Sequence, residues 1–129
     1  LLTPSAKRFV LFPLVEPSLW ESYKVQSEHF WTAEQCGVPP HDSLTHDGLP
    51  KPVRMCLART AALFASTYRP GGVIQSAVLS ISSRLHLPEA RTALGWHVMQ
   101  YNVHVEVACS IVDFLIGDSP LRGLLFDSV

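Results

Sequence analysis

One uninterrupted helical stretch, residues 89–117, constrains the fold of this chain more than any other feature. Pro88 suits the first turn of a helix, where its missing N–H would have had no partner, and Glu89 complements the positive helix end. Gly117 is placed to end the helix. The stretch therefore predicts a single long helix.

Two rows of this helix are apolar or carry side chains that look buried. The first row consists of Ala90, Leu94, His97, Tyr101, His104, Ala108, Val112 and Leu115. The second row consists of Ala93, Trp96, Val103, Val107, Ile111 and Phe114. Because a surface helix would show one wide charged face, the pattern predicts a helix that is buried at the centre of the fold.

Three polar side chains, His97, Tyr101 and His104, follow one another along the first row. A buried imidazole or phenol needs a hydrogen-bond partner or a metal ion, since an unpartnered buried polar group costs on the order of 1–3 kcal/mol. We therefore expect any chemistry of this chain to sit there. His97 and His104 lie roughly 10 Å apart along the helix axis, so we do not expect them to share a zinc ion.

The rest of the sequence predicts an all-α fold in one domain that spans residues 1–129. An apolar arm is expected to precede an N-terminal helix at about 18–35, which Cys36-Gly37 would end. Prolines, glycines and aspartates gather in residues 37–51, so this segment is predicted to be a loop.

A kinked helix pair is predicted at about 52–69 and 73–87. Both segments keep helical spacing of their apolar residues, but Pro70-Gly71-Gly72 separates them. Proline removes a backbone donor, and glycine raises the entropic cost of helix, so the pair must break or bend at this point. The last residues, 118–129, give no firm prediction.

Composition excludes several classes of function. The net charge of −1 gives no electrostatic reason to expect nucleic acid or an anionic membrane as a partner. No apolar run approaches the roughly 20 residues of a membrane span. The three cysteines include no CxxC pair, which argues against a disulfide framework and a cysteine zinc site. No secretory signal is evident, so an intracellular protein is expected, cytoplasmic or mitochondrial.

Two motifs resemble the small subunit of class I ribonucleotide reductase. The first comprises Arg8 to Leu14, Trp20, Tyr23-Lys24 and Phe30 to Glu34. The second comprises Pro88 to Arg91, Gly95-Trp96, Asn102, His104 and Glu106. The resemblance implies a ferritin-like helical bundle, of which this chain would form the N-terminal half. The long helices that we expect from the residues alone agree with that fold.

The resemblance also implies a di-iron site, and here the chain departs from the family. The family takes an Asp from its second long helix and a Glu-x-x-His pair from the next one. In this chain Tyr101 replaces the Glu, so only His104 matches a ligand. The Asp position falls near residues 68–71, and no Asp or Glu occurs between Asp47 and Glu89.

The radical-bearing tyrosine of the family corresponds to Ala108. Trp31 and His104 match two members of the family's radical-transfer route, but the Asp that would link them is not in this chain, so we expect no catalytic residue. His104 could be a lone metal ligand or a buried, hydrogen-bonded histidine. Tyr101 could carry a radical or could fill space that the metal and carboxylate occupy in the family. We expect the second role for each, with no metal and no cofactor.

These observations predict a non-catalytic relative of the reductase small subunit that acts as a structural or accessory subunit of a larger assembly, of which a mitochondrial complex is one candidate. Other protein subunits would cover its apolar helix faces. The alternative is a divergent small subunit of ribonucleoside-diphosphate reductase that generates a radical and completes an iron or manganese site with another chain. A third hypothesis is a small binding module with a pocket along the face of His97, Tyr101 and His104.

Overall fold

The computed structural model describes residues 2, 11–39, 48–117 and 120–127. These residues form helices and no strand, which confirms the all-α prediction. The elements are α1 (Pro17–Glu28), the short 3-10 helix η1 (Glu34–Cys36), α2 (Lys51–Tyr68), α3 (Val73–Arg84), α4 (Pro88–Ile116) and α5 (Leu121–Asp127). Residues 40–47 of the predicted loop and most of the predicted N-terminal arm lie outside the described residues.

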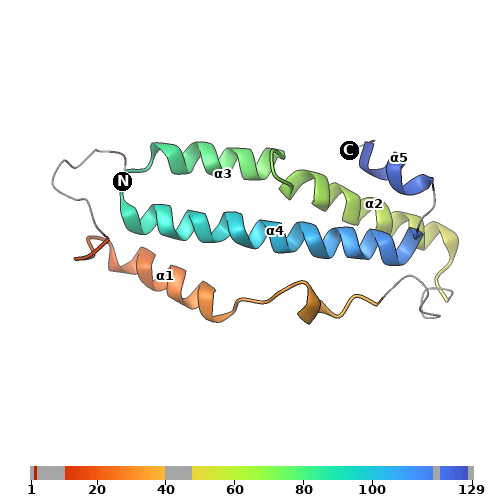
Figure 1. The fold of residues 1–129 in the computed structure, drawn as a ribbon, viewed down its shortest axis with the longest axis horizontal. Coiled ribbons are helices and arrows are strands. Elements are labelled where there is room, and N and C mark those ends of the chain that lie inside the picture. The colour runs from red at the N-terminus through yellow and green to blue at the C-terminus, as the bar shows by residue number, and fades with distance from the viewer. Residues whose placement is uncertain (1, 3–10, 40–47, 118–119, 128–129) are drawn as a thin grey trace.

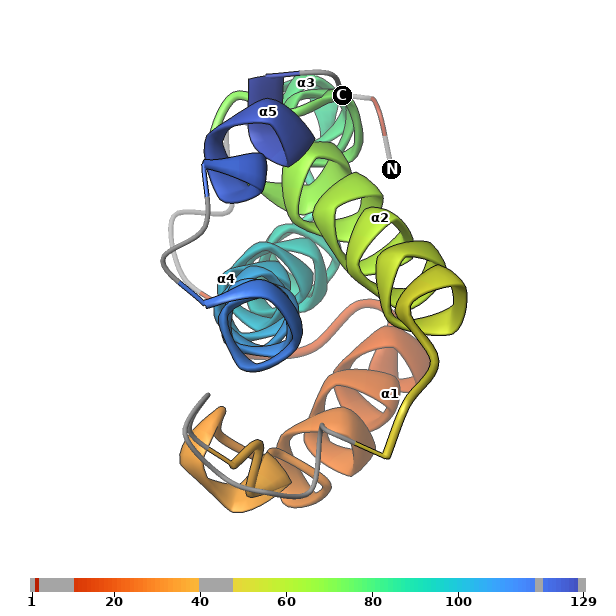
Figure 2. The ribbon, with the colours of Figure 1, turned by 90° about the vertical axis from the view of Figure 1, so that its right-hand side faces the viewer.

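The long helix α4 occupies the middle of the molecule (Figure 1). Helices α2 and α3 follow one another along one side of α4, and α1 lies on another side. The view along the bundle in Figure 2 places α4 between α1 and α5, with α2 beside it. Helix α4 packs against each of the other four α-helices, so the described fold is a partial bundle built around it.

The bounds predicted for α4 are confirmed to within one residue. Pro88 starts the helix, and Gly117, with φ of 62°, ends it while its N–H donates to the carbonyl of Asp113 at 2.8 Å. Its buried positions are Glu89, Ala90, Ala108, Val112 and Leu115. Most of its remaining side chains are half-buried, because the described helices cover α4 only in part.

The predicted kinked pair is also confirmed, although α3 ends at Arg84 rather than near residue 87. Between α2 and α3 the chain turns through Gly71, whose φ of 79° favours glycine. A Cβ on Gly72 would lie 2.6 Å from the carbonyl oxygens of Ser66 and Thr67. Glycine is therefore required there for a steric reason, because any side chain would collide with the end of α2.

The N-terminal helix is shorter than predicted, and the boundary of about 18–35 is wrong. Helix α1 ends at Glu28, and Phe30 and Trp31 lie beyond it. Nδ1 of His29 lies 2.8 Å from the carbonyl oxygen of Val25 and satisfies one of the last helical acceptors. The side chain of His29 thus helps to end the helix before the glycine and prolines on which the prediction depended.

The core lies where α2, α4 and α5 meet. Its buried members are Ala58, Ala61, Ala62, Val112, Leu115 and Leu125. The alanines form one side of α2 and let its backbone approach α4 closely. Helix α5, which was not predicted, contributes Leu125 and pairs Arg122 with Asp113 at 2.9 Å. Within the described ranges, none of the helices combines the length and apolar character that crossing a bilayer requires.

Candidate functional site

Residues at or near the positions where the resemblance places metal ligands meet at the C-terminal end of α2. The rings of Tyr68 and Tyr101 have centroids 5.0 Å apart. The ring centroid of His104 lies 6.1 Å from that of Tyr68 and 6.3 Å from that of Tyr101. These three residues form a triangle that we call the aromatic cluster. Tyr68 is the last residue of α2, so the kink before α3 determines where its ring meets α4.

Further rings extend the aromatic cluster on both sides. Trp31 stacks on His104, with centroids 5.3 Å apart and ring planes inclined by 25°. His97 lies one turn before Tyr101 on α4, and the two ring centroids are 6.3 Å apart. The two residues that match the family's radical-transfer route, Trp31 and His104, are therefore in contact. The segment after α1 carries Trp31 to this position.

The three polar residues of α4 are half-buried, not buried as the sequence pattern suggested. Even so, burial lowers the pKa of His104 below its ordinary value, because loss of water disfavours the charged imidazole. Burial thus favours the neutral form of His104. A neutral imidazole between Trp31 and the two tyrosines places no net charge in the aromatic cluster.

The residues present do not fit a di-iron group. Iron in such a site takes several anionic oxygen ligands, and bridging carboxylates hold the two cations together. In the aromatic cluster, the two phenol rings of Tyr68 and Tyr101 lie beside His104, and none of the three side chains is a carboxylate. Across the part of the chain that the structure describes, no group of three His, Cys, Asp or Glu residues could hold a metal ion. Ala108, at the radical-tyrosine position, is buried and carries no phenol.

Three relatives decide the family. A putative ribonucleoside-diphosphate reductase small chain of Arabidopsis thaliana is 30% identical over 129 residues, which cover all of this protein and 80% of the relative. The small chain of Neurospora crassa is 30% identical, and 31% of it is covered. Subunit M2 of Danio rerio is 32% identical, and 33% of it is covered. This chain belongs to the ribonucleoside-diphosphate reductase small-subunit family.

The chain spans about a third of the length of most of the curated small chains that it matches, among them those of Neurospora crassa and Danio rerio. It covers the larger part of the short Arabidopsis relative. No protein-family model matches the chain. Membership of the small-subunit family implies a helical bundle. The arrangement of the helices in this chain agrees with that fold.

The family motif at the start of α4 also stabilises the fold. The sequence pattern did not reveal this structural role. Glu89 belongs to the Pro88 to Arg91 motif but is fully buried, with an exposed fraction of 0%. Its Oε1 accepts a hydrogen bond from the backbone N–H of Val15 at 2.7 Å. The carboxylate of Glu89 thus ties the segment before α1 to the first turn of α4. Its place in the motif was the only sequence signal for this role.

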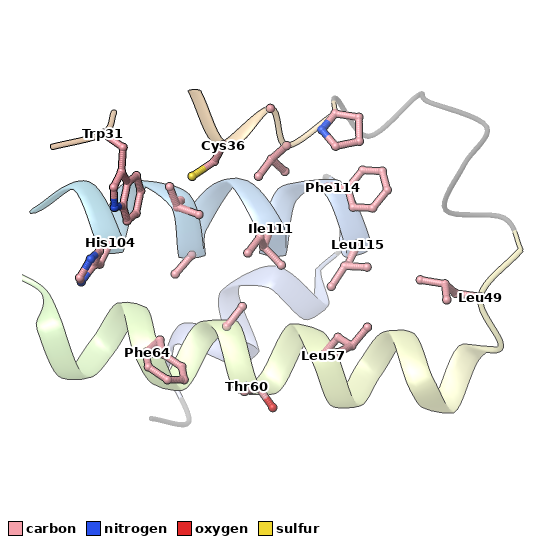
Figure 3. Close-up of a pocket in the computed structure, with 16 residues that line it drawn as sticks. Trp31, Cys36, Leu49, Leu57, Thr60, Phe64, His104, Ile111, Phe114 and Leu115 are labelled. Carbon is pink, nitrogen blue, oxygen red and sulfur yellow. The ribbon is translucent and has the colours of Figure 1, made fainter. Parts of the chain in front are cut away.

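An apolar groove lies beside the aromatic cluster, between α2, α4 and the segment after α1 (Figure 3). Its volume is about 650 Å³. Trp31, Phe64 and His104 line one end, and Leu49 lies at the other. Of the three residues along which a pocket was predicted, His97, Tyr101 and His104, only His104 lines this groove, and a pocket along all three stays a prediction. The ring of Tyr101 packs against Tyr68 within the aromatic cluster, and the ring of His97 contacts Tyr101.

Proposed function

We propose that this chain is a non-catalytic member of the small-subunit family and acts as a structural or accessory subunit of a larger protein assembly. The observation that carries the proposal is the contact between Tyr68 and Tyr101, with ring centroids 5.0 Å apart, beside His104. The resemblance implies a metal-binding Glu at position 101 and a metal-binding Asp near residues 68–71. Here the same positions carry rings that pack against one another.

The exchange of a carboxylate for Tyr101 has two physical effects. It removes an anionic oxygen that a hard metal ion requires. It also adds apolar ring surface, and aromatic pairs contribute about 0.5–1.5 kcal/mol beyond the area that they bury. Tyr68 and Tyr101 therefore join the end of α2 to the middle of α4 without a metal ion. This supports a role in which the fold is kept for its surfaces.

Exposed apolar side chains on α2 support the second half of the proposal. Val53, Leu57 and Phe64 lie on one side of α2 by helical spacing and are exposed by 45%, 46% and 53%. Contiguous apolar surface of this kind marks sites where other proteins bind. We propose that partner subunits, within an intracellular assembly that contains no direct nucleic-acid contact, cover this side of α2. A mitochondrial assembly is one form of the proposal.

One observation favours the second candidate function, a divergent reductase subunit that generates a radical with the help of another chain. Trp31 and His104, which match two members of the family's radical-transfer route, lie against one another with ring centroids 5.3 Å apart. For this function, a partner would have to supply the missing carboxylates. Stacking of the two rings also contributes to packing, so we rank this candidate second.

Elemental analysis of the native protein tests the proposal. The protein is purified with the subunits that accompany it, and iron and manganese are measured per chain. We expect well below one metal ion per chain, together with stable partner proteins. A full-length small chain such as subunit M2 of Danio rerio, purified in the same way, is the positive control. Stoichiometric iron or manganese would overturn the non-catalytic role and favour the second candidate.

A further inference from the structure

Tyr68 and Tyr101 are the closest pair of rings in the aromatic cluster. Their centroids lie 5.0 Å apart, near the short end of the roughly 4.5–7 Å range over which aromatic side chains pack. The ring planes are inclined by 49°, so the two phenols do not stack face to face. Tyr68 is the last residue of α2, and Tyr101 lies near the middle of α4. The contact therefore brings two phenols together from different helices.

The third tyrosine of the chain has different neighbours. The sequence contains three tyrosines, and all of them lie in the described ranges. The ring of Tyr23 contacts Trp20 and Trp96, with centroids 5.1 Å and 5.9 Å away. Among the described ring contacts, two tyrosines thus meet at positions 68 and 101 alone. Tyr23 provides an internal control for any chemistry that needs two phenols.

From this geometry we propose that Tyr68 and Tyr101 form a site of oxidative modification, at which a peroxide-driven one-electron oxidant joins the two rings through a carbon–carbon bond. The product is a dityrosine that links α2 to α4 within one chain. The inference goes beyond the proposed function and involves no metal ion bound by this chain. The oxidant is external, and both radicals end in the new bond.

The reaction balances with peroxide as the oxidant. Each phenol loses one electron and one proton and becomes a neutral phenoxyl radical. The two radicals couple between ring carbons next to the oxygens, and the hydrogen on each of those carbons then moves to the oxygen as a proton. Hydrogen peroxide, acting through a peroxidase, accepts the two electrons and two protons and becomes two molecules of water.

The surroundings of the two rings suit this chemistry. Because a phenoxyl radical is neutral, it forms among the other rings of the aromatic cluster without the cost of burying a charge. Phe64 stacks on Tyr68 with ring planes inclined by only 9° and helps to hold that ring in place. Ring contact makes coupling a reaction within one molecule, which is favoured over coupling between two chains. The broad χ2 torsion of tyrosine allows either ortho carbon to face its partner.

The bond would restrain the junction of α2 and α3. It closes a loop of 33 residues, from position 68 to position 101, and this loop contains the turn at Gly71 and all of α3. A cross-link of this kind restricts the unfolded chain, as a disulfide does, and we expect it to lower the unfolding equilibrium constant about a hundredfold or more. Oxidation would thus stabilise the fold instead of damaging it.

Oxidation of the native protein tests the inference. The protein, at low concentration, is treated with a peroxidase and an equimolar amount of hydrogen peroxide. We expect the blue fluorescence of dityrosine in a band that runs as a monomer on a denaturing gel, with a mass lower by two hydrogen atoms. A tryptic digest should yield one cross-linked pair of peptides, residues 60–84 and 92–122. Urea denaturation of the product measures the change in stability.

Matched variants assign the bond. Tyr68→Phe and Tyr101→Phe keep the ring and its packing but remove the phenol, and each should reduce dityrosine in the monomer about tenfold or more. Tyr23→Phe removes the tyrosine that has only tryptophan rings beside it, and should change the yield by less than about twofold. Circular dichroism checks that the three variants fold alike.

Three results would overturn the inference. The first is dityrosine that is confined to covalent dimers, which would show coupling between chains. The second is an equal yield from Tyr68→Phe, Tyr101→Phe and the unmodified chain. The third is oxidation of tryptophan, seen as added oxygen, without any dityrosine. Each is measured separately from the metal content of the native protein, so the proposed function stands or falls by its own test.

Discussion

Two turns of the same helix differ in what they keep of the small-subunit family. At the first turn of α4, Glu89 retains the family motif, is fully buried and accepts the N–H of Val15 at 2.7 Å. Further along, Tyr101 stands where the resemblance places a metal-binding Glu, in contact with Tyr68 and His104. One carboxylate is kept in the interior of the protein, and the other is replaced by a ring.

The difference separates groups that hold the fold from groups that hold a metal. A buried carboxylate such as Glu89 is costly unless it is hydrogen-bonded, and its loss would leave the N–H of Val15 without that acceptor. A carboxylate at position 101 would need a cation to balance its charge. Without the cation, a tyrosine at position 101 packs against Tyr68 better than an unpaired carboxylate would.

The largest effect is expected at the first turn. Glu89→Ala should lower the free energy of unfolding by about 2–4 kcal/mol, because it removes the acceptor for Val15 and leaves a cavity. Glu89→Gln keeps one oxygen and should cost less. Glu106→Ala, at an exposed position of α4, should change stability by less than about 0.5 kcal/mol. Urea denaturation measures the free energy of unfolding of all three variants. If Glu89→Ala lost no more stability than Glu106→Ala, the structural role of Glu89 would be contradicted.

An intermediate effect is expected when carboxylates are put back into the aromatic cluster. The double variant Tyr68→Asp and Tyr101→Glu places two carboxylates beside His104, so we expect it to bind Co²⁺ about tenfold or more tightly than the unmodified chain. It should also lose on the order of 1–3 kcal/mol of stability through lost ring packing and buried charge. Calorimetric titration and urea denaturation measure the two effects.

The control for that experiment is Tyr68→Phe with Tyr101→Phe, which keeps both rings and supplies no ligand. It should match the unmodified chain in Co²⁺ affinity. Should the unmodified chain bind Co²⁺ as tightly as the carboxylate variant, the interpretation of the aromatic cluster as a non-metal site would be wrong.

The smallest effect concerns the pH dependence of stability at His104. Because burial lowers the pKa of His104 in the folded state, the unfolded chain binds a proton more readily. The contribution of neutral His104 is thus fully present above its unfolded pKa of about 6.5 and is lost as the pH falls below it. His104→Phe keeps a ring against Trp31 and removes the titration, so its stability should fall less between about pH 7.5 and 5.

Unfolding of both proteins by urea at several pH values measures this difference. Carboxylates elsewhere affect the two proteins alike, so only the gap between the two profiles reports on His104. Parallel profiles would show that His104 does not change its affinity for protons on folding.

Where local chemistry alone sets the backbone, the sequence predicted the structure well. Pro88 and Gly117 bound α4 because proline suits a first turn and glycine adopts a positive φ at a helix end. Pro70-Gly71-Gly72 separates α2 from α3 for the same kind of reason. The family motifs, which are also a property of the sequence, placed Trp31 and His104 in one site, and the two rings do stack.

Tertiary contacts decided the rest. The ring of His29 ends α1 through the carbonyl of Val25, and this contact depends on a side-chain rotamer that periodicity does not specify. Helix α5 has only seven residues, too few to form without the core in which Leu125 is buried. The burial of Glu89 and the contact of Tyr68 with Tyr101 join segments that are distant in the chain. Such contacts follow from how the helices pack, because a helical pattern determines which side of a helix is apolar but not which residue will face it.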